Sequence, residues 1–370
     1  TITENLWKEG AILLGKLNCD EYAMGSSNET SYFGNVISPI GDKLVPGGSS
    51  GGSAAALGAG ATTIATGSDS TGSIRQPASQ CGVVGYQPPH GRIPNIGSSS
   101  FNGYAKSGPM TRTVKDCAIM ANVMSGHDYR DHNSFIEPVQ IELNDQNLAG
   151  MKIAFSMDLG CYEVSEDVQL ETNDAVRALR NAGAKVEEVS VTWAADLIDL
   201  ALGNQEVLFA AFLNETVKDH RDIVSDFVPQ LCQTANSYPA EIYHQSILTA
   251  GKIWLEHLGP LFQHYDAFVM PTTAYTDIPA TGWQKDTVNV NGKQYTDTDT
   301  TMAVIWNMYN RCPVMALPSG RASSGVPTGI QIIGRPHDDQ TVFQIANAFE
   351  KEKPWLDCVE RRPVLTPKPF

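Results

Sequence analysis

The feature of this sequence that most constrains its fold is a pair of glycine–serine loops separated by a short segment of small residues. The first loop reads PGGSSGGS over 46–53, and the second reads GSDSTGSIRQP over 67–77. The residues between them predict a tightly packed small-residue helix and then a strand over 62–66. Flexible glycine–serine linkers do not normally lead into such packed segments. We therefore expect both loops to be ordered parts of one site.

The serines of these loops suggest acyl-transfer chemistry. A hydroxyl can both donate and accept a hydrogen bond, so Ser49 is a candidate proton relay and Ser73 a candidate nucleophile. Backbone N–H groups beside Ser73 are candidate donors for a developing oxyanion. Two other motifs are excluded: neither loop contains the G-K-S or G-K-T of a phosphate loop, and Thr71 and Arg75 replace the glycines of a G-x-S-x-G elbow.

Three further blocks give these loops a context. They are CGVVGYQPPHGR over 81–92, GPMTRTVKD over 108–116 and LGKLNCDEYAMGSS over 14–27. With the two loops, they make the chain similar to the amidase signature family, and 265–273 and 327–334 also fit. The resemblance implies an α/β amidase signature fold: one large domain over 1–370, with a central mixed sheet covered by helices on both faces. It also implies hydrolysis of a carboxylic amide through a Ser–cisSer–Lys set, without metal or organic cofactor.

The resemblance assigns roles to individual residues. Ser73 matches the acylated nucleophile, and Ser49 matches the bridging serine that the family holds on a cis peptide bond. The oxyanion-hole segment matches Ser70, Thr71 and Gly72, and the residues that support the loops match Ser50, Asp69 and Arg75.

Two departures from the family pattern affect these assignments. Thr71 stands where the family usually has glycine, and a β-branched residue resists positive φ. No lysine before Ser49 lies in the family's K-D motif, so we interpret the sequence as N-terminally incomplete; a lysine-less, inactive binding scaffold is the alternative. Lys106 is interpreted as a solvated loop charge rather than a replacement base. His90, the rival base, is interpreted as a loop histidine bonded to backbone.

The stretch 301–313 bears on the substrate. In glutamine-hydrolysing A subunits of tRNA-dependent amidotransferases, the similar stretch carries an aspartate for the substrate's ammonium group, and Thr301 occupies that register here. Trp306, Met308 and Tyr309 make the segment bulky and apolar, as pocket or as core residues. We therefore predict a stand-alone amidase for an apolar or aryl amide. The alternatives are the glutamine-hydrolysing subunit, an ester hydrolase and the inactive scaffold.

Composition limits the class of protein. The net charge of −15 opposes direct nucleic-acid binding, and no apolar run is long enough to span a membrane. Seven scattered cysteines fit a reducing cytoplasm. The expected partner is a small-molecule amide, with a homodimer possible, or a partner subunit if the chain belongs to an amidotransferase.

Periodicity predicts alternating strands and helices. Strands are expected over 11–15, 82–84, 151–156, 185–191, 268–270, 314–317 and 329–334. Helices are expected over 114–124, from the Ser165 cap to Arg180, and from Asp338 or Asp339 to Lys351. Residues 194–265 are expected to be mostly helical and to form a substrate-side insertion. The polar segment 281–300 is interpreted as a disordered surface loop, with a pocket rim as the alternative.

Overall fold

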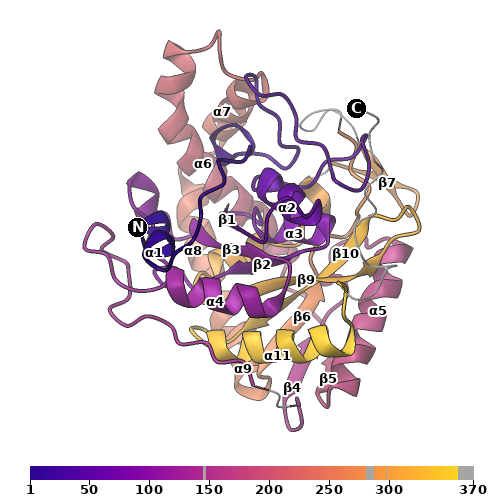
Figure 1. Cartoon of the computed structure of the whole chain (residues 1–370). Helices are drawn as coiled ribbons and strands as arrows, with labels where there is room; N and C mark the ends of the chain where they lie inside the picture. The colour runs from indigo at the N-terminus through magenta and orange to yellow at the C-terminus, as the bar shows by residue number, and fades with distance from the viewer. Residues whose placement is uncertain (145–146, 281–286, 297, 357–370) are drawn as a thin grey trace.

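An eight-stranded mixed sheet forms the centre of the computed structural model (Figure 1), which describes residues 1–370 except 145–146, 281–286, 297 and 357–370. Its strand order is β1-β3-β2-β9-β10-β6-β4-β5. Neighbours are antiparallel from β1 to β6, whereas β6, β4 and β5 run parallel. The strands are β1 (Ile64–Asp69), β2 (Val84–Gln87), β3 (Lys106–Thr111), β4 (Lys152–Phe155), β5 (Lys185–Glu188), β6 (Ala267–Pro271), β9 (Val314–Arg321) and β10 (Pro327–Gly334).

Both faces of this sheet are buried. Successive side chains of a strand point to opposite sides, so each strand contributes to the core on either face. In β6, Ala267 and Val269 pack into the core with α4 (Val114–Met124), α5 (Glu166–Asn181) and α11 (Asp339–Glu352). Phe268 and Met270 pack into a second core on the opposite face. Helices α2 (Gly51–Gly58) and α3 (Arg75–Cys81) also lie on that second face, opposite α4 and α11 (Figure 1). The fold is therefore the predicted single α/β domain with helices on both faces.

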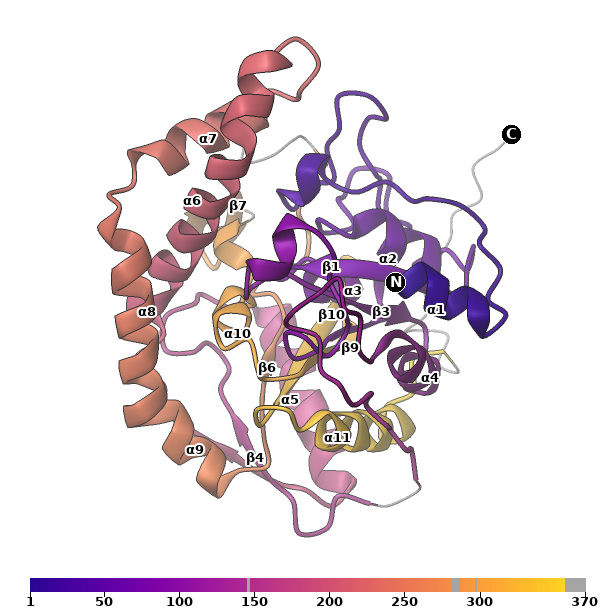
Figure 2. The same cartoon turned by 90° about the vertical axis from the view of Figure 1, so that its left-hand side faces the viewer.

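A column of helices runs along one side of the sheet (Figure 2). It consists of α6 (Ala195–Asp219), α7 (Phe227–Ser237), α8 (Glu241–Ile253), a π-helical turn (Trp254–Leu258) and α9 (Gly259–His264). The predicted helical character of 194–265 is confirmed. The face of α6 that includes Leu197 and Ala201 packs against the second core, so α6 is fixed to the sheet.

The remaining elements are short. They are α1 (Ile2–Lys8), α10 (Val304–Met308), the β7–β8 hairpin (Val288–Val290 and Lys293–Tyr295) and the 3₁₀ turns Glu21–Ala23, Ser98–Phe101 and Thr298–Thr300. The hairpin shows that the described part of 281–300 is ordered, so the surface-loop interpretation is wrong there; residues 281–286 and 297 lie outside the described part. Among the described helices, none is long and apolar enough to cross a membrane.

Two further sequence predictions are wrong. Residues 11–15 form no strand in the described structure, and Ile12 and Leu14 are 84% and 75% exposed. An apolar run becomes a buried strand only where a neighbouring strand pairs with it. Lys106 is not a solvated loop charge, because it is buried at the start of β3, opposite Asp69 of β1.

Candidate active site

The first glycine–serine loop is held by close backbone packing. The Gly48–Ser49 peptide bond is cis. The Asn28 side-chain amide donates to the Gly47 carbonyl at 2.6 Å, and the Ser49 carbonyl accepts from the Asp20 N–H at 3.3 Å. A Cβ on Gly48 would collide with the Asp20 carboxylate. Glycine is therefore required at this position by the packing, and Ser49, 1% exposed, is fixed at the start of α2.

The second loop is organised around the carboxylate of Asp69, at the end of β1. Asp69 Oδ1 accepts from the Gly72 N–H at 2.8 Å, and Oδ2 accepts from the Ile74 N–H at 3.1 Å. Gly72 has φ of +126°, whereas Thr71 is not among the residues with positive φ. The threonine therefore fits the loop without distortion. The Gly72 N–H is already bonded, which leaves Ser70 and Thr71 as the better oxyanion candidates of the predicted three.

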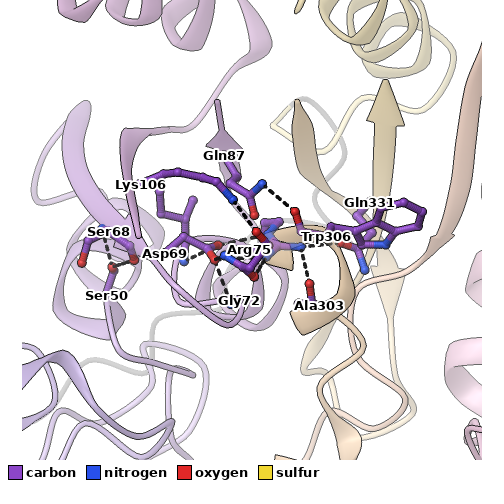
Figure 3. A network of polar contacts seen from close by, with 12 residues as sticks. Ser50, Ser68, Asp69, Gly72, Arg75, Gln87, Lys106, Ala303, Trp306 and Gln331 are labelled. Atoms are coloured by element: carbon purple, nitrogen blue, oxygen red, sulfur yellow. Dashed lines mark hydrogen bonds and ion pairs between the residues drawn. The ribbon is translucent and has the colours of Figure 1, made fainter. Parts of the chain in front are cut away.

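The two loops lie side by side. The Ser50 N–H donates to the Ser73 carbonyl at 3.1 Å. The Ser50 hydroxyl also bonds both backbone groups of Ser68, each at 3.1 Å (Figure 3). Ser50 therefore joins the first loop to the end of β1.

Arg75 is the centre of the polar network beneath the second loop (Figure 3). Its side chain is fully buried and donates to both oxygens of Asp69, each at 3.0 Å. It also donates to Asn307 Oδ1 at 2.6 Å, to Gln331 Oε1 at 3.0 Å and to the Ala303 carbonyl at 3.0 Å. These bonds tie the Ser73 loop to α10 and to β10.

Two members of this network are not predicted from the sequence. Gln331 interrupts the apolar strand β10 and donates to the Met302 carbonyl at 2.8 Å. Asn307 donates to Asp69 Oδ1 at 2.7 Å. A lone glutamine within the apolar run GIQIIG is a usable signal, because a buried amide needs partners. Asn307 offers no such signal in sequence.

Burial and charge set the ionisation of this network. Burial raises the pKa of Asp69, but the charge and hydrogen bonds of Arg75, with smaller contributions from Asn307 and Lys106, together lower the pKa to about 2. Burial lowers the pKa of Lys106 to about 7, against the opposing effect of Asp69. Lys106 Nζ donates to the Asn307 carbonyl at 3.3 Å. Since Arg75 already pairs with Asp69, Lys106 is a second buried basic group beside a single carboxylate.

A cavity of about 590 Å³ opens over the second loop. Ser70, Thr71 and Ser73 line it, together with Gly48 of the first loop. The other walls come mainly from residues 23–26, from α6, from residues 161–163 and from described residues between Gln294 and Val304. Of the segment 281–300, Gln294, Tyr295 and 298–300 line the cavity, so the pocket-rim alternative is confirmed for these residues. In the part of the chain that the structure describes, no lysine, arginine or histidine lines this cavity. The loops and the helical column thus share one concave site.

The stretch that suggested an apolar substrate is mostly core. Trp306 and Tyr309 belong to the second core, and Met308 packs against it. The Trp306 side chain is fully buried, and the Tyr309 hydroxyl donates to the Ala250 carbonyl at 3.1 Å. Thr301 and Val304 of this stretch line the cavity, whereas Trp306, Met308 and Tyr309 do not. The core alternative is confirmed, so these aromatics give no evidence for an apolar or aryl substrate.

Neither rival base is placed to reach Ser73. His90 is 5% exposed, interacts with the backbone of Ala105, and does not line the cavity. Its pKa is lowered mainly by burial. The interpretation of His90 as a backbone-bonded histidine is confirmed. Lys106 is also absent from the cavity lining, and in Figure 3 its side chain runs toward Arg75 rather than toward Ser50.

Comparison with known proteins identifies the class to which this fold and site belong. The family model described as Amidase matches residues 1–343. The chain belongs to the amidase signature family, and it is an amidase, a hydrolase of C–N bonds.

Two relatives of known name show how similar the chain is to members of this family. The chain is 33% identical to the A subunit of glutamyl-tRNA(Gln) amidotransferase of Staphylococcus aureus (strain Mu3 / ATCC 700698), over 98% of this chain and 78% of that protein. The corresponding protein of Pelagibacter ubique (strain HTCC1062) is 31% identical, over 95% and 76%.

Two solved structures share the fold. A bacterial aryl acylamidase of the amidase signature family superposes with a TM-score of 0.88 at 25% identity, covering 100% of this chain and 78% of that one. The A subunit of glutamyl-tRNA(Gln) amidotransferase from Thermotoga maritima gives 0.78 at 30% identity, covering 99% and 79%.

Proposed function

We propose that this amidase acts through an acyl-enzyme, with Ser73 as nucleophile and Ser49 as the proton relay. The supporting observation is the contact between the loops. The Ser50 N–H bonds the Ser73 carbonyl at 3.1 Å, and both Ser73 and Gly48 border the same cavity. An amide bound there meets the Ser73 hydroxyl and the first loop together.

Each step of this mechanism conserves atoms and protons. Ser73 Oγ forms a bond to the amide carbon while its proton passes to Ser49, which hands it to a base. The resemblance to the amidase signature family implies that this base is a lysine. The C–N bond then breaks, and the relay returns the proton to the leaving amine. Water hydrolyses the acyl–Ser73 ester and releases the acid, which regenerates the hydroxyl.

The oxyanion is stabilised by backbone donors of the second loop. The N–H groups of Ser70 and Thr71 are proposed for this role, because the Gly72 N–H is bonded to Asp69. One such donor is typically worth about 3 kcal/mol of barrier. Asp69 and Arg75 act indirectly, by holding the loop geometry.

We propose a stand-alone amidase rather than a glutamine-hydrolysing subunit. Thr301 borders the cavity at the register where those subunits carry an aspartate. The described lining also offers no cationic side chain for the α-carboxylate of glutamine. Ammonia release from glutamine separates the two: brisk release that depends on added partner chains supports the subunit instead.

We further propose a cytoplasmic location, since Cys81, Cys117 and Cys312 are buried free thiols.

Serine substitutions test the mechanism. Ser73→Ala is expected to lower amide hydrolysis by about a thousandfold or more, and Ser49→Ala by about a hundredfold or more. Ser68→Ala is the matched control, because that side chain is exposed and borders no part of the cavity. It is expected to stay within about threefold of the wild-type rate. A Ser73→Ala variant that keeps the wild-type rate refutes the mechanism.

A further inference from the structure

The lining of the cavity is rich in carboxylates. The acidic residues that line it are Glu163, Asp199, Glu206 and Asp299. The described lining contains no cationic side chain to balance them. A ligand in this cavity therefore meets an excess of negative charge.

These carboxylates are not equivalent. Glu163 is paired with Lys293 Nζ at 2.7 Å, just outside the lining. Asp299 accepts from the Thr296 N–H and hydroxyl at 2.9 and 2.8 Å. Asp199 is exposed at the solvent side. These three have either partners or water, so none of them requires a ligand.

Glu206 is different, because one of its oxygens is buried without a partner. It lies on α6, seven residues after Asp199 and so on the same face of the helix. Its Oε2 is buried and has no hydrogen-bond partner among the described residues. Burial raises the pKa of Glu206, while a hydrogen bond from Tyr238 opposes that effect. A buried carboxylate oxygen of this kind costs free energy until a donor reaches it.

A second orphaned group borders the cavity near Ser73. Gln76, one turn after Ser73, is 3% exposed and lines the cavity, and its Nε2 has no hydrogen-bond partner among the described residues. The cavity thus presents an unsatisfied donor close to the nucleophile and an unsatisfied acceptor on the α6 wall. An unpaired hydrogen-bond donor and an unpaired acceptor at separate places in the lining indicate a polar ligand that spans the cavity.

We propose that Glu206 determines substrate specificity, by selecting amides whose end remote from the scissile bond carries a protonated amine. The inference rests on the proposed function for the position of the scissile amide. A remote ammonium group supplies the donor that Glu206 Oε2 lacks and balances the negative charge of the lining. A remote carboxylate meets repulsion there, because the described lining contains no cationic side chain to hold it.

Binding of three matched primary amides tests this proposal. δ-Aminovaleramide ends in an ammonium group, hexanamide is its neutral isostere, and glutaramate ends in a carboxylate. Affinities are measured by calorimetry on the Ser73→Ala chain, in which turnover does not consume the ligand. We expect δ-aminovaleramide to bind about tenfold tighter than hexanamide, as for a charge-assisted hydrogen bond in a partly buried site. Glutaramate is expected to bind more weakly than hexanamide.

Substitutions on α6 assign the effect to one residue. Glu206→Gln, in the same background, is expected to reduce the preference for δ-aminovaleramide to within about twofold, whereas Glu206→Asp retains part of it. Glu215→Gln is the matched control, since it makes the same change at an exposed position of the same helix, outside the cavity. It is expected to leave the preference unchanged. Far-UV circular dichroism checks that each variant is folded.

The salt dependence of binding is a second test of the proposal, and it requires no substitution at Glu206. The preference is expected to shrink as salt is raised toward molar concentration, because screening weakens the attraction.

Three results would overturn the proposal. They are equal binding of the ammonium and methyl ligands, a preference that survives Glu206→Gln, and no binding of any ligand at millimolar concentration. Hydrolysis by the wild-type chain separates the two proposals. Selective binding with Ser73-independent turnover refutes only the mechanism, and Ser73-dependent turnover that ignores charge refutes only the specificity.

Discussion

Replacing Lys106 by methionine is expected to stabilise the protein at neutral pH and to remove a component of its pH dependence. Lys106 is 3% exposed beside a carboxylate that Arg75 already pairs. Its pKa is lowered by burial from 10.5 to about 7. The difference corresponds to about 5 kcal/mol of folding free energy between the fully charged and fully neutral side chain.

The sign follows from proton binding. Between pH 7 and 10.5 the unfolded chain holds this proton and the folded chain does not, so stability rises with pH. The penalty is fully present below about pH 7. Lys106→Met is therefore expected to raise the free energy of unfolding by about 4 kcal/mol at pH 7. This gain is expected to fall toward zero as pH approaches 10.5, the ordinary pKa of the side chain.

Urea unfolding followed by circular dichroism measures this effect at several pH values between 6 and 10. The exposed Lys115 of α4 supplies the control, because Lys115→Met removes the same charge from the surface. Amide hydrolysis is expected to persist in Lys106→Met, since Lys106 does not line the cavity. A stability difference that is the same at every pH, or a loss of stability in Lys106→Met at pH 7, contradicts the reasoning.

Three other changes test the structure around the site. Asp69→Asn leaves Arg75 buried without its counter-ion and is expected to cost about 3–5 kcal/mol in urea unfolding; a cost below about 1 kcal/mol would contradict the network. Gly72→Ala is expected to cost more than Gly150→Ala, because both residues have positive φ but only at Gly72 would a Cβ meet a neighbour. Equal unfolding free energies for the two variants would refute that contact. Tyr309→Phe is expected to cost about 1 kcal/mol with an unchanged hydrolysis rate, whereas a changed substrate preference would place this side chain in the pocket.

Local sequence signals predicted several helices well, whereas the strand expected over 82–84 is observed at Val84–Gln87. The helix over 114–124 was predicted with its observed bounds, and Thr113 caps it by accepting from the Asp116 N–H. The final helix begins after Asp338, which caps it by accepting from the Thr341 N–H. Caps and periodicity are local properties, so they can be read without knowing the neighbours.

Properties that depend on distant partners were not predictable in the same way. The strand expected over 11–15 failed, because pairing requires a second strand. Lys106 lies between serine, glycine and alanine and was interpreted as loop, although pairing with Asp69 across β1 and β3 buries it. Glu206 gave no signal at all, since only the tertiary fold brings α6 and the serine loops to the same cavity.

The most direct test of the central claim is detection of the acyl-enzyme. The chain is mixed with an activated amide, quenched rapidly in acid and analysed by mass spectrometry. The account predicts a mass increase equal to the acyl group, located by fragmentation on Ser73 and absent from Ser73→Ala. Acylation of another residue, or turnover at the wild-type rate in Ser73→Ala, would contradict it.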